Sequence, residues 1–262
     1  MNRFPDALIA RYLKRGRVQG WLDAFSAQVI AEISSFQNRS SIEGAVAEIG
    51  IHHGKLFFVL YLTTKRSETA LAIDVFDAQH LNIDHSGQGN KRIFLEHARK
   101  WTGMDGLKLL EKSSLEVSPG EIIEAVGHVR LFSIDGSHTE DATLNDLRLA
   151  DATLTPEGVV VLDDVFQEFW PEVSVALGKF ITSSRTLLPF AITPNKVFLA
   201  RPKMAPTYAE ALTNAFPQKI EKTATYYGGE VKLMGVLKLT LRARFGKTKV
   251  GRLIKRVLGR GT

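Results

Sequence analysis

The stretch FSIDGSHTEDATLNDLRLADATLTPEGVVVLDDV, residues 132–165, contains two apolar runs separated by a segment with helical spacing. Thr139 can act as the N-cap of this helix, and two acids follow it in the positive first turn. Apolar residues then recur at helical spacing until the segment TPEG, and we expect the next strand to start at Gly158. A strand, a helix and a second strand in this order predict a parallel β-α-β unit.

Short apolar runs of the same kind recur along the chain. They lie at residues 45–50, 69–76, 107–114, 129–136, 158–165, 187–194 and 196–202. Runs of Val, Ile, Leu and Phe without polar alternation are typical of strands covered on both faces, and the first five leave room for helices between them. We therefore predict an α/β fold with a doubly wound, mostly parallel sheet. Residues 21–36 predict an amphipathic helix that packs against a sheet edge as an N-terminal cap.

The chain has 262 residues, of which 44% are hydrophobic, and this length suits one large α/β domain. We divide it into a helical cap at 1–40, a main domain at 41–237 and a tail at 238–262. The sequence has no cysteine, which excludes disulfides and thiolate metal sites. Because no apolar run approaches the roughly 20 residues that span a bilayer, and the N-terminus lacks the apolar core of a secretory signal, we expect a cytoplasmic protein.

The net charge of +6 is concentrated in the tail. Residues 238–262 contain nine Lys or Arg and no acid, so residues 1–237 hold 25 basic and 28 acidic residues, a net charge of −3. This distribution argues against nucleic acid as a partner. From Val250 onward, apolar and basic residues separate onto two sides of a helix, a pattern typical of an anionic membrane surface or a protein contact. A peripheral contact with the inner membrane surface and a homo-oligomer both stay open.

Acidic residues follow two of the predicted strands, at the point where each strand ends. Asp135, with His138 three residues later, follows the fourth run, and Asp163 and Asp164 follow the fifth. In open α/β sheets, ligands bind beyond the carboxyl ends of the strands. Each Asp alone is equally compatible with a helix cap or a turn. Three crowded carboxylates repel one another, however, and together they indicate a site for a cation such as Mg²⁺, which prefers about six oxygen ligands.

The segment VAEIGIHHG after the first apolar run indicates a ligand-binding turn between a strand and its helix. Gly50 and Gly54 allow a ligand to approach the backbone, and the helix N-terminus supplies free N–H groups. The dinucleotide fingerprint G-x-G-x-x-G is not met, because Glu48 and His53 stand at two of its glycine positions. Asp74, at the end of the second strand, can accept both hydroxyls of a ribose. We therefore predict a nucleoside-containing cofactor without a pyrophosphate.

In this order, the segments VAEIGIHHGK, AIDVFDAQ, FSIDGSHTEDATLNDL and GVVVLDDV resemble class I S-adenosylmethionine-dependent methyltransferases. They are most similar to the branch whose acidic clusters hold a divalent cation and which includes sugar O-methyltransferases. The resemblance covers residues 40–200 approximately and implies a seven-stranded, Rossmann-like sheet. It places the cofactor, S-adenosylmethionine, over the first two strands, at Glu48, Gly50, His53, Gly54 and Asp74. It places Mg²⁺, or another divalent cation, at Asp135, Asp163 and Asp164.

By the same resemblance, His138 matches a general base that some members carry three residues after the first metal ligand. Other members carry an aspartate base where this chain has Ser137, which cannot do that work. A metal-bound hydroxyl becomes more acidic, so an imidazole with a pKa near about 6.5 could remove its proton as methyl transfer begins. The resemblance therefore implies a magnesium-dependent O-methyltransferase that acts on a hydroxyl of a sugar or glycan-like small molecule.

Two other functions stay open at this point. An NAD-dependent oxidoreductase has a similar sheet, although the missing glycine fingerprint and the Asp163–Asp164 pair argue against it. A non-catalytic binding protein on a methyltransferase-like scaffold would bind the cofactor without turnover. Two features also have two interpretations each. Trp170 either flanks the substrate pocket or packs in the core, and the polar segment 80–97 is either a lid over the cofactor or an ordinary surface loop.

Overall fold

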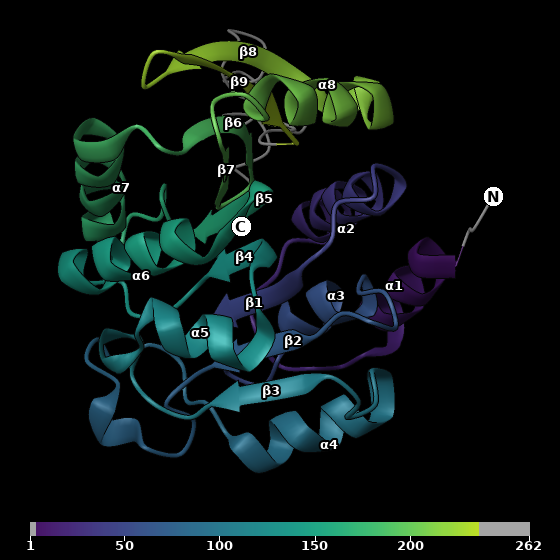
Figure 1. Ribbon diagram of the computed structural model, residues 1–262, viewed down its shortest axis with the longest axis vertical. Helices are drawn as coiled ribbons and strands as arrows, with labels where there is room; N and C mark the ends of the chain where they lie inside the picture. The colour runs from purple at the N-terminus through teal and green to yellow at the C-terminus, as the bar shows by residue number, and fades with distance from the viewer. Residues whose placement is uncertain (1–3, 236–262) are drawn as a thin grey trace, which may run out of the picture.

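The computed structural model describes residues 4–235, and the predicted tail at 238–262 lies outside the described residues. The described residues form one sheet of nine strands in the order β3-β2-β1-β4-β5-β7-β6-β9-β8 (Figure 1). The strands are β1 (Ala45–Ile49), β2 (Ala70–Ile73), β3 (Leu107–Leu110), β4 (Val129–Ile134), β5 (Leu154–Asp163), β6 (Leu188–Thr193), β7 (Lys196–Ala200), β8 (Ile220–Tyr226) and β9 (Gly229–Met234). Strands β1 to β5 pair in parallel, which confirms the predicted α/β sheet.

The second half of the sheet changes direction. Strand β7 is antiparallel to both of its neighbours, β5 and β6, and β9 runs parallel to β6. Strand β8 pairs antiparallel with β9 and ends the sheet. A tight turn at Pro194 and Asn195 joins β6 to β7. Because Lys196 at the start of β7 pairs with Asp163 at the end of β5, this turn lies at the same edge as the carboxyl ends of β1 to β5.

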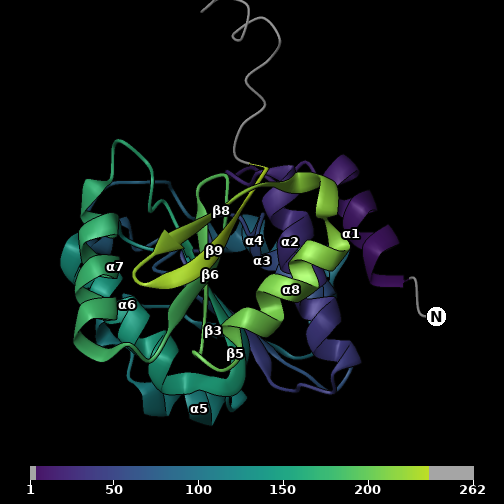
Figure 2. The same cartoon turned by 90° about the horizontal axis from the view of Figure 1, so that it is seen from above.

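Helices cover both faces of the sheet. They are α1 (Phe4–Arg15), α2 (Ala24–Arg39), α3 (Phe57–Leu62), α4 (Lys91–Trp101), α5 (Pro119–Val126), α6 (Glu140–Thr153), α7 (Pro171–Ser184) and α8 (Ala205–Ala215). Three short 3-10 turns complete the order, η1 (Gln79–Leu81), η2 (Ser114–Glu116) and η3 (Pro217–Lys219). Helices α5, α6 and α7 lie on one face, and α1, α2, α3 and α8 lie on the other (Figure 2).

Two clusters of buried apolar side chains fill the space between the sheet and these helices. Val46 of β1 joins the cluster that contains Ile30 of α2, whereas the next residue, Ala47, joins the cluster that contains Leu147 of α6. Successive strand residues point to opposite faces of a sheet, so a sheet covered on both faces needs apolar residues at consecutive positions. The apolar runs of the sequence are unbroken because helices cover both faces of the sheet.

The predicted number of seven strands was too low. The additional pair, β8 and β9, forms a hairpin beyond β6. Lys222 and Glu221 of β8 are exposed and Lys232 of β9 is half-buried, so the hairpin alternates polar and apolar residues instead of forming an apolar run. An edge hairpin with one solvated face carries this pattern, which a search for buried strands passes over.

Strand β5 starts at Leu154 and not at Gly158, as the sequence had suggested. Leu154 pairs with Val129, after which the register between β4 and β5 shifts, so that Leu131 pairs with Val159. The irregularity accommodates the segment that contains Pro156, which cannot donate a ladder hydrogen bond. Helix α6 therefore passes into β5 without an intervening loop.

Helix α2 lies over a face of the sheet and not along its edge, which corrects the expected packing of the N-terminal helix. Its residue Gln37 donates from Nε2 to the carbonyl oxygen of Arg130 in β4 at 2.7 Å. The helix begins after Asp23, whose carboxylate accepts the backbone N–H groups of Phe25 and Ser26 at 3.0 and 2.9 Å. This cap also fixes the segment before α2 beside the carboxyl edge of the sheet.

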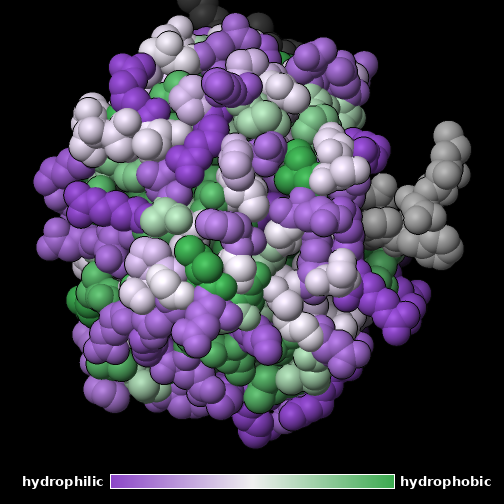
Figure 3. Space-filling model, in the orientation of Figure 1, coloured by the Kyte–Doolittle hydropathy of each residue, from purple (hydrophilic) through white to green (hydrophobic). Residues whose placement is uncertain are grey.

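The surface of the protein is mostly hydrophilic on the side shown in Figure 3. On the side shown in Figure 3, hydrophilic residues surround small, separate apolar patches. Among residues 4–235, none of the helices is both long enough and apolar enough to cross a membrane.

Candidate active site

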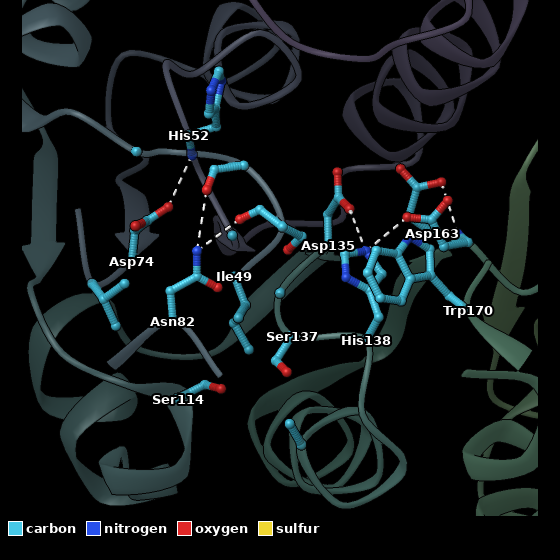
Figure 4. A pocket seen from close by; sticks show the side chains of 18 of the residues that line it. Ile49, His52, Asp74, Asn82, Ser114, Asp135, Ser137, His138, Asp163 and Trp170 are labelled. Atoms are coloured by element: carbon cyan, nitrogen blue, oxygen red, sulfur yellow. Dashed lines mark hydrogen bonds and ion pairs between the residues drawn. The ribbon is translucent and has the colours of Figure 1, made fainter. Parts of the chain in front are cut away.

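A cavity of about 620 Å³ lies at the carboxyl ends of the parallel strands. Loops that follow β1, β2, β3, β4 and β5 form its wall, together with the segment before α2 and the turn between β6 and β7. Six of the predicted site residues line it, namely Gly50, Asp74, Asp135, His138, Asp163 and Asp164. Figure 4 labels four of them, Asp74, Asp135, His138 and Asp163. Residues from segments far apart in the sequence are thus brought to one edge of the sheet, where open α/β sheets bind ligands.

Gly50 is required by the path of the backbone after β1. It has a φ of +84°, and a Cβ at this position would lie 1.8 Å from the carbonyl oxygen of Asp135. Its N–H donates to the carbonyl oxygen of Ile73 at 3.0 Å. The turn after β1 is therefore packed directly against the end of β4, and only glycine fits this contact.

Asp74 holds the turn after β1 from the neighbouring strand. Its Oδ2 accepts the backbone N–H groups of Ile51 and His52 at 2.5 and 2.9 Å, and its Oδ1 accepts that of Phe76 at 2.5 Å. Burial raises the pKa of Asp74, and these three hydrogen bonds oppose the shift. The carboxylate also lines the cavity, so it can receive a further donor from a ligand.

The other predicted cofactor residues lie behind the cavity wall. Glu48 is a buried residue of β1, and burial together with the charge of Asp135 raises its pKa. His53 is buried and stacks on His52 with ring centroids 4.0 Å apart. A Cβ at Gly54 would lie 2.6 Å from the ring of Phe58, so this glycine allows close helix packing. These three residues shape the turn from beneath.

Asp135, His138 and Asp164 converge in one corner of the cavity. One ligand atom from each lies within 4.8 Å of the others, a spacing that could hold a metal ion. The imidazole Nε2 of His138 lies 2.8 Å from Asp164 Oδ2 and 4.0 Å from Asp135 Oδ1. Burial and the charge of Asp163 raise the pKa of Asp135. Burial opposes ionisation of Asp164 too, but hydrogen bonds from His138 and Asn195 lower its pKa.

Asp163 lies beside this group and has other partners. Lys196 Nζ contacts its Oδ2, and Asn195 Nδ2 donates to its Oδ1 at 3.0 Å. Burial disfavours the ammonium, but the charges of Asp163 and Asp135 raise the pKa of Lys196, which therefore stays protonated. We did not anticipate Lys196 from the sequence. The signal was present in the Asn195-Lys196 pair at the start of β7, which faces Asp163 in the antiparallel register.

His138 is held between two carboxylates. Asp84 Oδ2 lies 2.7 Å from the imidazole Nδ1 and accepts the backbone N–H of His138 at 2.6 Å, while Nε2 faces Asp164. Burial opposes protonation, but the hydrogen bonds to Asp164 and Asp84 raise the pKa of His138 to about 10. The sequence did not predict Asp84. It lies within the polar segment that was expected to be either a lid or a surface loop.

Trp170 completes the surroundings of the imidazole. Its ring is stacked on that of His138, with centroids 4.5 Å apart and an angle of 16° between the planes. Trp170 also lines the cavity, so it both packs and flanks the pocket. The stacked ring excludes water from one face of His138 and limits its rotation.

Residues 47–165 match the family model described as a methyltransferase domain. The match begins in β1 and ends just after β5, so it contains the Gly50 turn and both acidic clusters. These residues therefore form a methyltransferase domain, which supports the resemblance to class I S-adenosylmethionine-dependent methyltransferases. No curated protein matches its sequence significantly. The NAD-dependent alternative is not favoured by these findings.

Solved structures share the fold of this methyltransferase at low sequence identity. The O-methyltransferase NovP is 14% identical with a TM-score of 0.58, over 67% of this chain and 80% of NovP. The SAH-bound Podospora anserina methyltransferase PaMTH1 is 16% identical with a TM-score of 0.52, over 76% of this chain and 88% of its own. An O-methyltransferase from Bacillus cereus in complex with SAH is 11% identical with a TM-score of 0.51, over 76% and 90%.

The donor set of this methyltransferase is compatible with a divalent cation. Four carboxylates, those of Glu48, Asp135, Asp163 and Asp164, lie near the ammonium of Lys196 at this end of the cavity. Burial raises the pKa values of Glu48 and Asp135, and the neighbouring carboxylates add to the shift, a repulsion that a bound cation would reduce. Asp135 and Asp164 offer carboxylate oxygens, the ligand type that Mg²⁺ prefers.

Proposed function

We propose that this methyltransferase transfers the methyl group of S-adenosylmethionine to a hydroxyl oxygen of a sugar or glycan-like small molecule, with Mg²⁺ as a second cofactor. One observation carries this proposal. His138 presents Nε2 to Asp164 and Asp135 inside the cavity, while its Nδ1 is held by Asp84. A fixed imidazole beside two carboxylates is an arrangement that can activate a hydroxyl group.

The cofactor would lie on the side of the cavity formed by β1 and β2. Gly50 would let it approach the backbone, and the free lone pairs of Asp74 would accept ribose hydroxyls. Glu48, His53 and Gly54 would act beneath the turn by fixing its shape. When bound, S-adenosylmethionine supplies an electrophilic methyl group.

Asp135 and Asp164 would hold the cation, and Asp163 is a further candidate ligand that Lys196 now neutralises. When bound, the cation makes a coordinated hydroxyl more acidic. The hydrogen bonds of His138 to Asp164 and Asp84 raise its pKa, so a cation held by Asp164 would weaken one of the two contacts that keep the imidazole protonated.

His138 would remove the acceptor proton through Nε2. Asp84 accepts the Nδ1–H and stabilises the imidazolium that this transfer creates. The acceptor oxygen then forms a bond to the methyl carbon as the bond from that carbon to sulfur breaks, and S-adenosylhomocysteine is the second product. Trp170 keeps water away from one face of the base during this step.

Oxygen as the acceptor atom is supported by the names of two similar structures, NovP and the Bacillus cereus protein, which are O-methyltransferases. A sugar is supported by aromatic and amide groups in the lining of the cavity. Trp21 and Trp170 offer aromatic faces, and Gln167 and Asn195 offer amide groups. Aromatic faces with a few polar groups suit a ring that has both C–H faces and hydroxyls.

Calorimetric titration tests both cofactors. Purified protein is titrated with S-adenosylmethionine and then with MgCl₂, and wild type is compared with an Asp135→Asn, Asp164→Asn double variant. We expect both to bind S-adenosylmethionine and only wild type to bind Mg²⁺. Asp141→Asn is the matched control, because Asp141 is an exposed acid of the same region that does not line the cavity. Equal Mg²⁺ binding by the double variant would contradict the assigned cation site.

Transfer itself is measured with radiolabelled S-adenosylmethionine and a panel of free sugars, nucleotide sugars and catechols. Label in a sugar hydroxyl would support the proposed acceptor class, and label in a catechol would overturn it. Binding of the cofactor without transfer to any compound, in the presence of Mg²⁺, would favour a non-catalytic binding protein on this scaffold.

A further inference from the structure

The loop from Gln79 to Gly89, here called the Asp84 loop, both lines the cavity and contacts His138. Gln79, Leu81, Asn82, Ile83, Ser86, Gly87 and Gly89 line the cavity. The loop is tied by its own hydrogen bonds, because Asn82 Nδ2 donates to the carbonyl oxygens of Ser86 and Gly87 at 2.8 and 3.1 Å. Such internal bonds give a loop without regular structure a defined shape.

From this loop the side chain of Asp84 reaches His138, 54 residues away in the sequence. The side chain of Asp84 is 5% exposed. Oδ2 contacts both the backbone N–H and the Nδ1 of His138, and Oδ1 accepts the backbone N–H and the hydroxyl of Ser86 at 2.9 and 2.7 Å. Both oxygens are therefore fixed, one by the loop and one by the histidine.

This geometry determines which nitrogen of His138 faces the cavity. Burial alone would raise the pKa of Asp84, but hydrogen bonds from His138 and Ser86 hold it below its usual range. An ionised carboxylate only accepts hydrogen bonds, so Nδ1 must carry the proton in this contact. Nε2 faces Asp164 and Asp135, and by the same rule it donates to the Asp164 carboxylate until another group takes that contact. Contacts at both the backbone and the ring restrict rotation of the imidazole.

We propose that Asp84 is a positioning residue that holds the His138 imidazole with Nδ1–H hydrogen-bonded and Nε2 toward the reacting oxygen. The orientation of the base then depends on the Asp84 loop, which also lines the cavity. This inference rests on the proposed function, because it assigns Asp84 a part in the reaction of His138. The contact between the two side chains can nevertheless be tested without any acceptor.

The first test uses ¹⁵N-histidine-labelled full-length protein and NMR spectroscopy. In wild type we expect a slowly exchanging, low-field proton signal from Nδ1–H of His138, assigned by its loss in His138→Asn. Asp84→Asn is expected to abolish this signal. Asp77→Asn is the control, because Asp77 is an exposed acid just before this loop and accepts from Asn90 Nδ2 at 2.9 Å and the Lys91 backbone N–H at 3.4 Å, not from His138. A signal that persists in Asp84→Asn would overturn the proposal.

The second test is kinetic and uses the acceptor that the panel above identifies. Asp84→Asn is expected to lower kcat about 10- to 100-fold, with the KM for S-adenosylmethionine within about twofold of wild type. If Asp84→Asn is poorly folded by thermal unfolding, Ser86→Ala replaces it, since it removes only the hydroxyl that holds Asp84 Oδ1. A smaller loss of kcat in the same direction is then expected, and an unchanged kcat would overturn the proposal.

Failure of the proposed function gives a different result. Wild type would then transfer no methyl group to any compound, while the NMR comparison would still show whether Asp84 holds His138. If Asp84→Asn loses the NMR signal but keeps the kcat of wild type, then Asp84 contacts His138 in wild type but has no role in the reaction.

Discussion

The ammonium of Lys196 contacts the carboxylate of Asp163 in the interior of the protein, where their side chains are 3% and 7% exposed. The two residues pair directly across the antiparallel strands β5 and β7, so the contact follows from the register of the sheet. Asp135 and Glu48 also act on Lys196 through their charges. Lys196 is thus a fixed cation at the acidic end of the cavity.

We predict that Lys196→Met destabilises the fold by about 3–5 kcal/mol, because it leaves the buried carboxylate of Asp163 without its cationic partner. The double variant Asp163→Asn, Lys196→Met should recover most of this loss. Urea unfolding gives both values. Lys179→Met is the control, since Lys179 pairs with Glu140 on the surface with 57% of its side chain exposed, and its effect should stay within about 0.5 kcal/mol. Equal effects of the two lysine variants would show that burial of the pair does not matter.

Gly50→Ala should destabilise the protein by about 1–3 kcal/mol or more and weaken cofactor binding. The residue has a φ of +84°, and an added Cβ would meet the Asp135 carbonyl oxygen at 1.8 Å. Gly120→Ala is the matched control: a Cβ there lies 3.8 Å from Ser118 Oγ, within helix α5. That control should raise stability by about 0.5–1 kcal/mol. Thermal unfolding and calorimetry with S-adenosylmethionine measure both effects, and a Gly50→Ala protein as stable as wild type would contradict the contact.

The sequence predicted the edge of the sheet at which the site lies because parallel topology constrains it. Once 45–50 and 129–136 are interpreted as neighbouring parallel strands, their carboxyl ends must meet, and Gly50 and Asp135 are in contact in the structure. The apolar runs were long and unbroken because both faces of the sheet are covered. Burial on two faces leaves a strong pattern in the sequence.

Other features left no such pattern. Asp84 lies in an irregular loop, and nothing in its neighbourhood announces a contact with His138, 54 positions later. The partner of Asp163 depends on β7, which enters the sheet between β5 and β6 against the order of the chain. Long-range pairing of this kind is set by tertiary packing, which local periodicity does not report.

Trp21→Ala should raise the KM for the acceptor about 2- to 12-fold with little change in kcat, as an aromatic contact of about 0.5–1.5 kcal/mol predicts. Trp21 is 75% exposed, lines the cavity and lies 5.6 Å from the ring of His52. An exposed tryptophan at a cavity is suited to contact a ligand ring. Phe169→Ala is the control, because Phe169 is also 75% exposed but does not line the cavity. Steady-state kinetics with the identified acceptor measures the KM of each variant. Trp21→Phe should retain most of the affinity for the acceptor.

Removal of residues 246–262 tests the tail, whose sequence suggests contact with an anionic membrane surface. The deletion removes six of the nine basic residues between 238 and 262, together with the apolar side of the predicted helix. We expect full-length protein to sediment with vesicles that contain anionic lipid and less so at high salt, and the truncated protein to remain in the supernatant. Sedimentation with purely zwitterionic vesicles is the control. If both forms sediment equally, the tail has another role, such as contact with a protein or a second copy of the chain.

Asp146 of α6 should make the protein less stable as the pH rises. It is fully buried, its Oδ2 has no hydrogen-bond partner among the described residues, and burial raises its pKa to about 6. In the unfolded chain this carboxyl loses its proton near pH 4, whereas the folded protein keeps the proton until about pH 6. Unfolding therefore releases a proton between these values, so the free energy of unfolding falls as the pH rises through this window, by about 3 kcal/mol for two pH units.

Urea unfolding at pH 4.5 and pH 7.5 checks this dependence in wild type, Asp146→Asn and Asp141→Asn. Asp141 lies on the same helix and is exposed, so its variant should show the same change between the two pH values as wild type. Asp146→Asn has no group to titrate at this position, and its stability relative to wild type should rise by about 1–3 kcal/mol between pH 4.5 and pH 7.5. Any constant cost of the amide cancels in this difference. If Asp146→Asn and wild type lose stability in parallel, Asp146 does not keep its proton in the folded protein.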